Sequence, residues 1–294
     1  DLECFATIDG LLLGLTEFRY ETSLAKKSTA ARMSRVVRLL ESGEFPAEPG
    51  AGGAAVRSVP YLIFELGEGD IRPSVDVSKR VTNKWRFTVI HRTVAALLQL
   101  HQANIAHQDV KPSNVVRFRG DQLKIADLGR STERGNVAPH DIRDVPGAAV
   151  YAPFELQYGY TLPEWIERRI STDVFHVGCL IVFTFTNVVL PGHVISRLAY
   201  AYHSQAWGDG YLGVIPHIRQ ALEISLSEIA PDFPDAYRTE LVAMVRDLCD
   251  PDPTKRGTGT GTKSNAGTTL WLQKYLSRLD ILEKKAGMEA AHSN

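Results

Sequence analysis

The chain has 294 residues, enough for one large domain or two modest ones with a buried core. Apolar residues make up 44% of the sequence and charged residues 23%, which is ordinary for a soluble globular protein. The formal net charge of −1 gives no electrostatic reason to expect nucleic acid or an anionic membrane as a partner.

The three cysteines, Cys4, Cys179 and Cys249, are odd in number and far apart. Their spacing fits neither a disulfide framework nor a metal site, so we expect a reducing, cytoplasmic location. The chain begins with Asp1 rather than methionine and has no signal-peptide pattern. We therefore expect a processed N-terminus or a fragment.

The first third of the chain predicts one helix and one long hairpin. Residues 16–32 are rich in Glu, Lys, Leu and Ala, which favours a helix. Residues 59–66 read as a buried strand ended by the glycines of 67–70, and residues 36–40 suit a partner strand. The stretch 46–55 is a flexible loop by its glycine and proline content, so it closes the hairpin.

The rest of the chain is predicted to be mostly helical. Apolar residues recur at helical spacing over 85–101, and two short strands, 114–118 and 122–126, flank a tight turn. The apolar run 177–190 is shorter than the roughly 20 residues a membrane span needs, so we expect a buried helix. Helices continue to about residue 283, with frayed residues after it. Strands followed by helices predict an α+β fold with a small sheet lobe and a larger helical lobe.

The most informative segment is HQDVKPSN at residues 107–114, followed after the predicted strands by Asp127-Leu128-Gly129. These residues resemble the catalytic loop H-R-D-x-K-x-x-N and the metal-binding D-F-G of eukaryotic-type serine/threonine protein kinases. Either tripeptide alone is a common loop sequence, because Asp and Gly favour turns. Their order, separated by one hairpin, makes the resemblance specific.

The resemblance implies a role for each polar residue of these loops, with ATP and Mg²⁺ as cofactors. Asp109 is expected to accept the proton of the attacking hydroxyl, and Lys111 to reach the γ-phosphate. Asn114 and Asp127 offer oxygen ligands for magnesium. His107 is expected to pack under the metal loop rather than to act as an acid or base.

Three further motifs extend the resemblance towards the C-terminus. They are YAPFEL at residues 151–156, which is similar to the end of the activation segment, DVFHVG at 173–178, and DPDPTKR at 250–256. In the family, the glutamate of the first motif pairs with the arginine of the last. The resemblance therefore implies a buried ion pair between Glu155 and Arg256, although such an arginine, taken alone, would be read as exposed.

The nucleotide-binding residues are assigned by the same resemblance. The sequence Phe64-Glu65-Leu66-Gly67 falls where the family has its gatekeeper and hinge, whose backbone binds the adenine edge. Asp70 is expected to face the ribose, and Val116 to lie under the adenine ring. The hinge divides the chain into a partial N-terminal lobe, residues 1–66, and a C-terminal lobe, residues 67–294.

The family's glycine-rich loop and strand lysine are not visible in the sequence. No G-x-G-x-x-G precedes the hairpin, and Lys26 and Lys27 come too late. In the family that lysine pairs with a helix glutamate and grips the phosphates. Glu21 is the candidate for this glutamate. Either the first strands precede Asp1, which the missing methionine favours, or the chain is a degenerate kinase with a remodelled small lobe.

Two substitutions bear on activity. Gln108 replaces the arginine that, in the family, receives an activation-loop phosphate. We therefore do not expect that mode of activation, although Ser131 and Thr132 lie nearby in the sequence. Ala148 follows Gly147 where threonine is usual. Because that hydroxyl normally bridges the catalytic aspartate and lysine, its loss is expected to loosen both.

We therefore expect a serine/threonine protein kinase that acts on protein substrates. The competing hypothesis is a pseudokinase, a binding or scaffolding module that uses the fold without phosphoryl transfer. A third hypothesis, a small-molecule kinase of related fold, is less favoured. Such enzymes usually lack the equivalents of Lys111 and of the Glu155–Arg256 motifs.

Overall fold

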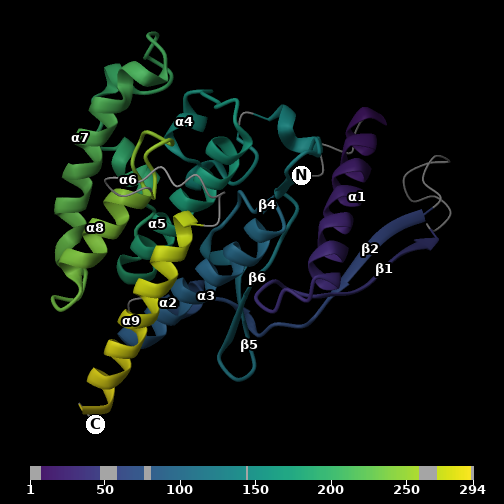
Figure 1. The fold of residues 1–294 in the computed structure, drawn as a ribbon. Coiled ribbons are helices and arrows are strands. Elements are labelled where there is room, and N and C mark those ends of the chain that lie inside the picture. Colours follow the sequence, from purple (N-terminus) through teal and green to yellow (C-terminus); the bar gives the residue numbers. More distant parts are fainter. Residues whose placement is uncertain (1–7, 47–57, 76–80, 144, 258–269, 293–294) are drawn as a thin grey trace.

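The structure is a computed structural model that describes residues 8–46, 58–75, 81–143, 145–257 and 270–292. Figure 1 shows a broad helical body beside a narrower one. The narrower body holds α1 (Ile8–Ala30) and the hairpin of β1 (Leu39–Pro46) and β2 (Ser58–Phe64), with β5 (Val115–Phe118) and β6 (Gln122–Ile125) between the two bodies. This arrangement confirms the expected α+β fold with a small and a large lobe.

Helix α1 begins earlier than the predicted start at residue 16. The leucine-rich stretch before Thr16 continues the helix because leucine is a strong helix former. Leu24 and Ala25 are buried on the side that faces the rest of the protein. The chain turns away after the helix at Arg32, whose positive φ of 54° is incompatible with continued α-helix.

The predicted hairpin is present, but its first strand was placed too early. Strand β1 pairs antiparallel with β2, with Leu39 opposite Phe64. Val36 and Val37, which we expected in this strand, instead lie beside β6, where the Val37 amide donates to the Ile125 carbonyl at 2.9 Å. Both valines are buried there, so burial against β6 outweighs pairing in the hairpin. Residues 47–57 of the predicted loop lie outside the described residues.

A second sheet connects the two lobes. Strand β3 (Gly69–Asp70) lies next to β5, which pairs antiparallel with β6. The predicted strands at 114–118 and 122–126 are thus confirmed, while the last two residues of the expected turn at 67–70 form β3. Gly120 and Asp121 have φ values of 72° and 56°, which allow the tight reversal between β5 and β6.

The core of the large lobe is built around two helices, α3 (Asn83–Gln102) and α5 (Ser171–Thr186), and short helix α2 (Arg72–Val75) precedes them. Helix α5 confirms the buried helix predicted from the apolar run. By length and composition, one helix among the described residues, Ile166–Thr186, could span a membrane, yet 94% of its most apolar window is buried inside the protein. Cys179 and Cys249 are free, buried thiols.

Shorter elements complete the lobe around these two helices. Strands β4 (Ile105–Ala106) and β7 (Thr132–Glu133) pair antiparallel on either side of the predicted catalytic loop. A π-helical turn, Ile166–Ile170, leads directly into α5. Helices α6 (Leu190–Ile195), α7 (Tyr211–Ile229) and α8 (Arg238–Leu248) lie at the left of Figure 1, and the short helix α4 (Phe154–Gln157) lies nearer its top centre.

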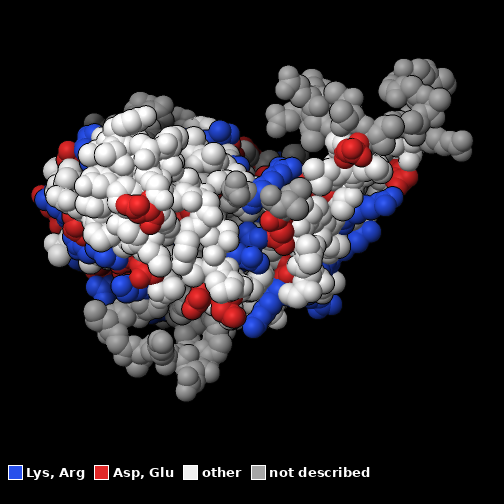
Figure 2. Space-filling model, turned by 90° about the horizontal axis from the view of Figure 1, so that it is seen from above, with Lys and Arg blue, Asp and Glu red and all other residues white. Residues whose placement is uncertain are grey.

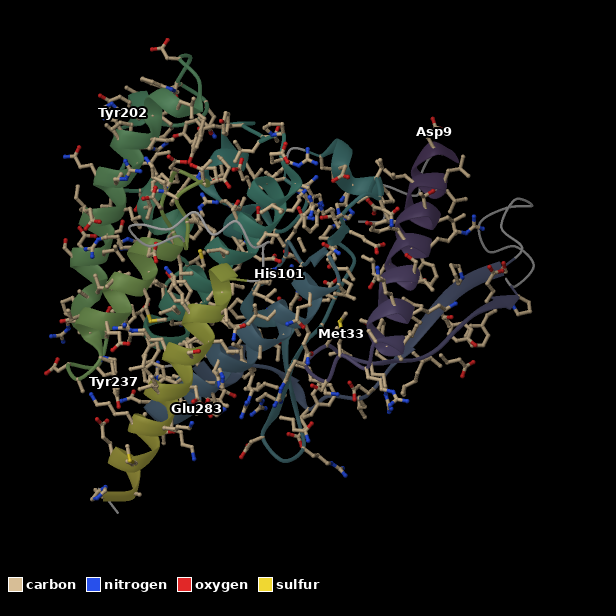
Figure 3. The ribbon with its side chains drawn as sticks, in the orientation of Figure 1. Asp9, Met33, His101, Tyr202, Tyr237 and Glu283 are labelled. Carbon is tan, nitrogen blue, oxygen red and sulfur yellow. The ribbon has the colours of Figure 1, made fainter. Side chains whose placement is uncertain are left out.

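The C-terminal residues are helical rather than frayed. Helix α9 (Leu270–His292) runs along α3, and Leu279 and Leu282 are buried against it. Glu283, labelled in Figure 3, accepts hydrogen bonds from Thr88 at 2.9 Å and from His91 at 2.7 Å. These contacts fix α9 on α3 at residue 283, where the sequence predicts that fraying begins.

The predicted ion pair between Glu155 and Arg256 is present and buried. The guanidinium donates to the two carboxylate oxygens at 2.6 and 2.5 Å and lies 4.8 Å from the Phe175 ring centroid. Burial alone would lower the pKa of Arg256, but the Glu155 carboxylate outweighs it and the pKa is raised. The pair therefore ties α4 to the loop that follows α8.

Replacing Arg256 with methionine should destabilise the protein by about 3–5 kcal/mol, because it leaves the Glu155 carboxylate buried without a partner. Urea unfolding followed by circular dichroism measures this loss. Arg246→Met is the matched control, since its bidentate pair with Glu223 is 49% and 44% exposed. The control should cost about 0–1 kcal/mol. Equal losses in both variants would contradict the assignment.

Candidate active site

The three predicted catalytic residues lie in one hydrogen-bonded cluster. Lys111 Nζ donates to Asp109 Oδ2 at 2.6 Å. Asn114 Nδ2 donates to the Asp109 carbonyl at 2.9 Å and to Oδ2 at 3.2 Å. A turn of 3₁₀-helix, Pro112–Asn114, brings Asn114 back over the loop. The structure thus places a carboxylate, an ammonium and an amide side by side.

The second oxygen of Asp109 is held by backbone. The Ala148 amide donates to Asp109 Oδ1 at 2.9 Å. A side chain at Gly147 would not fit, because its Cβ would lie 2.5 Å from the Gln108 carbonyl oxygen. We expected that the missing threonine hydroxyl would loosen Asp109 and Lys111. The two side chains are in direct contact, and the Ala148 amide supplies a donor to the carboxylate.

The metal loop lies beside the catalytic loop, as the sequence implied. His107 Nε2 lies 3.1 Å from the carbonyl oxygen of Ala126, so the ring packs under this loop as expected. Asp127 has a φ of 67°, a strained value for a non-glycine residue and one that clusters at functional sites. The Asp127 Oδ1 accepts the Gly129 amide at 3.2 Å.

The Glu21 carboxylate lies near that of Asp127. Burial, and then the charge of Asp127, raise the pKa of Glu21, and Arg130 opposes them. Within the part of the chain that the structure describes, neither carboxylate forms a salt bridge. Asp127 and Asn114 therefore provide hard oxygen ligands in a negatively charged setting, and this donor set fits Mg²⁺.

A cavity of about 350 Å³ lies between the lobes. Apolar residues line most of it, including Val36, Phe64 and Val116, and Glu65 and Asp127 are among its polar residues. An apolar slot with few polar groups suits a flat ring attached to a charged tail, as in ATP. Seen from above in Figure 2, charged side chains gather where the narrower body meets the broader one.

A second hollow of about 500 Å³ adjoins the first, and Glu21 and Asp127 line both. Asp109 and Lys111 also line the second hollow. The predicted adenine site and the predicted transfer site are therefore neighbours. This arrangement allows one elongated ligand to reach from the apolar slot to the catalytic loop.

The predicted nucleotide-binding residues are only partly brought together. Glu21, Glu65 and Val116 line the apolar cavity, whereas Leu66 and Asp70 are not among its lining residues. The Leu66 side chain is 93% exposed. The Asp70 carboxylate is engaged by Arg72 at 2.8 and 3.0 Å, which lowers the pKa of Asp70. The roles proposed for these residues stay predictions.

Sequence reasoning missed that Asp173 organises the catalytic loop. Its carboxylate accepts the backbone amides of His107 at 2.8 Å and Gln108 at 2.7 Å, and it lies 2.7 Å from Nε2 of His101 (Figure 3 labels His101). Burial would raise the pKa of Asp173, but these donors outweigh it and the pKa is lowered. The motif at 173–178 marked this residue, yet spacing alone did not reveal its contacts.

Gln108 and Arg169 form a second contact that the sequence did not predict. Gln108 has a φ of 61° and donates from Nε2 to the Arg130 carbonyl at 2.9 Å and to Thr132 Oγ1 at 3.0 Å. Arg169 Nη1 donates to Gln108 Oε1 at 2.7 Å. Because Arg169 belongs to no recognised motif, no signal in the sequence could have located it.

The sequence model of the protein kinase domain matches residues 16–266. That range covers most of the chain, so this protein belongs to the protein kinase domain family. The recognition made from the loop motifs is thereby confirmed.

The curated relatives are similar to this chain at low sequence identity and over less than half of its length. The chain is 27% identical over 145 residues to mitogen-activated protein kinase 12 of Oryza sativa subsp. japonica, covering 47% of this chain and 24% of that protein. It is 25% identical over 138 residues to mitogen-activated protein kinase 19 of Arabidopsis thaliana, covering 45% of this chain and 22% of that protein. The matches thus span about a quarter of these relatives.

Replacing Asp173 with asparagine should destabilise the protein by about 3 kcal/mol at pH 7, because an amide cannot accept all three hydrogen bonds and carries no charge. The pKa of Asp173 is lower in the folded state, so its contribution is present above the unfolded value of about 3.9 and is lost as pH falls through the folded pKa. Urea unfolding at pH 7 and below pH 4 measures both effects.

The difference in free energy of unfolding between the parent and Asp173→Asn should therefore become smaller in acid. Asp235→Asn serves as the control, since the Asp235 side chain is 89% exposed and lies far from the loop in the sequence. The control should leave stability unchanged at both pH values. If that difference in free energy of unfolding stayed constant from pH 7 into acid, the role given to the Asp173 charge would be contradicted.

Proposed function

We propose that this chain transfers the γ-phosphate of ATP, with Mg²⁺, to serine or threonine hydroxyls of protein substrates. The observation that carries the proposal is the cluster in which Asp109 binds Lys111 and Asn114 at 2.6 and 3.2 Å beside the metal loop. Lysine at position 111 is the serine/threonine pattern of the resemblance. Membership of the family and the kinase relatives support the same activity.

The proposed mechanism assigns one task to each side chain. Asp109 accepts the proton of the attacking hydroxyl and orients it, since its own oxygens are fixed by Lys111 and the Ala148 amide. Lys111 neutralises charge on the transferred group. Asn114 and Asp127 would hold the magnesium ion, which would neutralise phosphate charge when bound.

A binding module without transfer is the second candidate, and one observation favours it. Glu21, the residue expected to pair with the strand lysine, has no salt-bridge partner among the described residues. A nucleotide bound without that lysine would lack one ionic contact to its phosphates. In this case the chain would bind ATP in the apolar cavity and pass no phosphate on.

Transfer of labelled γ-phosphate to a generic protein substrate tests the proposal. Asp109→Asn and Asp127→Ala should each lower the rate at least about a hundredfold, because they remove the general base and a metal ligand. Asp121→Asn is the matched control. Asp121 lies in the β5–β6 turn with a φ of 56°, which asparagine tolerates, so its rate should equal that of the parent.

Thermal melting with and without ATP and Mg²⁺ separates the two candidates. A melting temperature raised by nucleotide together with transfer supports a kinase. A raised melting temperature without transfer by the parent supports the binding module and contradicts the proposed activity. Transfer that persists in Asp109→Asn would contradict the assigned mechanism.

A further inference from the structure

The activation segment, residues 127–155, offers few places for a regulatory phosphate. Its hydroxyl side chains are Ser131, Thr132 and Tyr151. Ser131 and Thr132 are 0% and 1% exposed, and Thr132 accepts a hydrogen bond from Gln108. Neither hydroxyl is accessible to another enzyme while the segment keeps this conformation. Tyr151 is half-buried at the end of the segment. In this conformation the segment is ordered by contacts that involve no phosphate.

A carboxylate within the segment makes the contact that such a phosphate could make. Asp141 Oδ1 accepts a hydrogen bond from Nη2 of Arg169, and Asp141 Oδ2 accepts the Ala138 amide at 3.0 Å. The same guanidinium donates from Nη1 to Gln108 at 2.7 Å. Arg169 is only 5% exposed, so its charge is buried, while the Asp141 side chain keeps 23% of its surface exposed and reaches solvent on one side. The anion thus connects through one arginine to the residue before Asp109.

Helix α1 restrains the same segment from its other side. Glu17 accepts hydrogen bonds from Arg130 at 3.2 Å and Arg143 at 2.7 Å. The Glu133 amide donates to the Tyr20 hydroxyl at 3.0 Å, and the Glu133 carboxylate pairs with Lys27. Residues 130–143 are therefore held between α1 and the π-helical turn that carries Arg169.

We propose that Asp141 is a built-in anion that, through Arg169 and Gln108, holds the catalytic loop in its transfer geometry without phosphorylation of the activation segment. Arg169 is a positioning residue, since its hydrogen bonds reach Gln108 and Asp141 rather than Asp109 or Lys111. The inference rests on the proposed function for its catalytic consequence. The ordering of the segment, by contrast, can be measured without any transfer.

Hydrogen–deuterium exchange on this chain, without nucleotide, tests the ordering. Asp141→Asn should speed exchange of the amides of residues 133–143 and 107–109 about tenfold or more, because a lost contact raises the population of locally open states. Asp235→Asn, an exposed aspartate paired with Arg238, should leave these amides unchanged. Unchanged exchange in folded Asp141→Asn would overturn the proposal, whatever the activity.

Kinetics then test the catalytic consequence. Asp141→Asn should lower kcat about 10- to 100-fold, because small displacements of positioned groups are costly, and should change the KM for ATP less than about twofold. Arg169→Met should have a similar effect. The double variant should be no slower than Arg169→Met alone, because Arg169→Met already removes the contact that Asp141→Asn weakens. If the losses in kcat of the two single variants added up in the double variant, the proposed connection from Asp141 through Arg169 would be overturned.

Phosphatase treatment of the parent separates the built-in anion from a phosphate. Activity retained within about twofold supports the proposal, and activity lost more than about tenfold overturns it. A parent with no transfer at all would refute the proposed function only. In that case the exchange rates of Asp141→Asn and Asp235→Asn still decide whether Asp141 orders the segment.

Discussion

The buried carboxylate of Asp173 is the constraint on which the site depends. It fixes the backbone at His107 and Gln108, and Asp109 follows directly. The positive φ of Gln108 is unfavourable for an isolated chain, so it persists because fixed acceptors on α5 hold it. The position of the catalytic loop is therefore set by α5, a helix buried in the core of the large lobe. Because a closely packed core deforms little, the loop is held firmly in place.

The two lobes contribute unequally to the proposed chemistry. The large lobe supplies Asp109, Lys111, Asn114 and Asp127, and buried ionic contacts support them from behind. The described part of the small lobe supplies apolar walls and Glu21, whose carboxylate lies near that of Asp127 and forms no salt bridge among the described residues. The proposed activity therefore depends on whether the large lobe's arrangement suffices to hold ATP for transfer.

The sequence predicted the parts that a local pattern or a family motif marks. The strands on either side of the 119–121 turn, the buried helix and the Glu155–Arg256 pair are each marked by short patterns or motifs. The candidate site residues Asp109, Lys111, Asn114 and Asp127 could be proposed because their spacing is itself the signal.

Contacts between distant segments escaped prediction where no family motif marks both partners. Val36 and Val37 have strand propensity, but which strand they join depends on where Ile125 lies. Likewise, nothing in the residues around Arg169 indicates that it reaches both Gln108 and Asp141. Propensity and periodicity report on neighbours in sequence, so a partner many residues away is visible only in the folded chain.

The most direct test is mass spectrometry of a peptide library incubated with this chain, Mg²⁺ and ATP carrying ¹⁸O in its γ-phosphate. The account predicts isotope-labelled phosphate on serine and threonine, made at a rate that rises with the concentration of the chain. Peptides that stay unlabelled, while the chain demonstrably binds the same ATP, would contradict the claim that this cluster transfers phosphate.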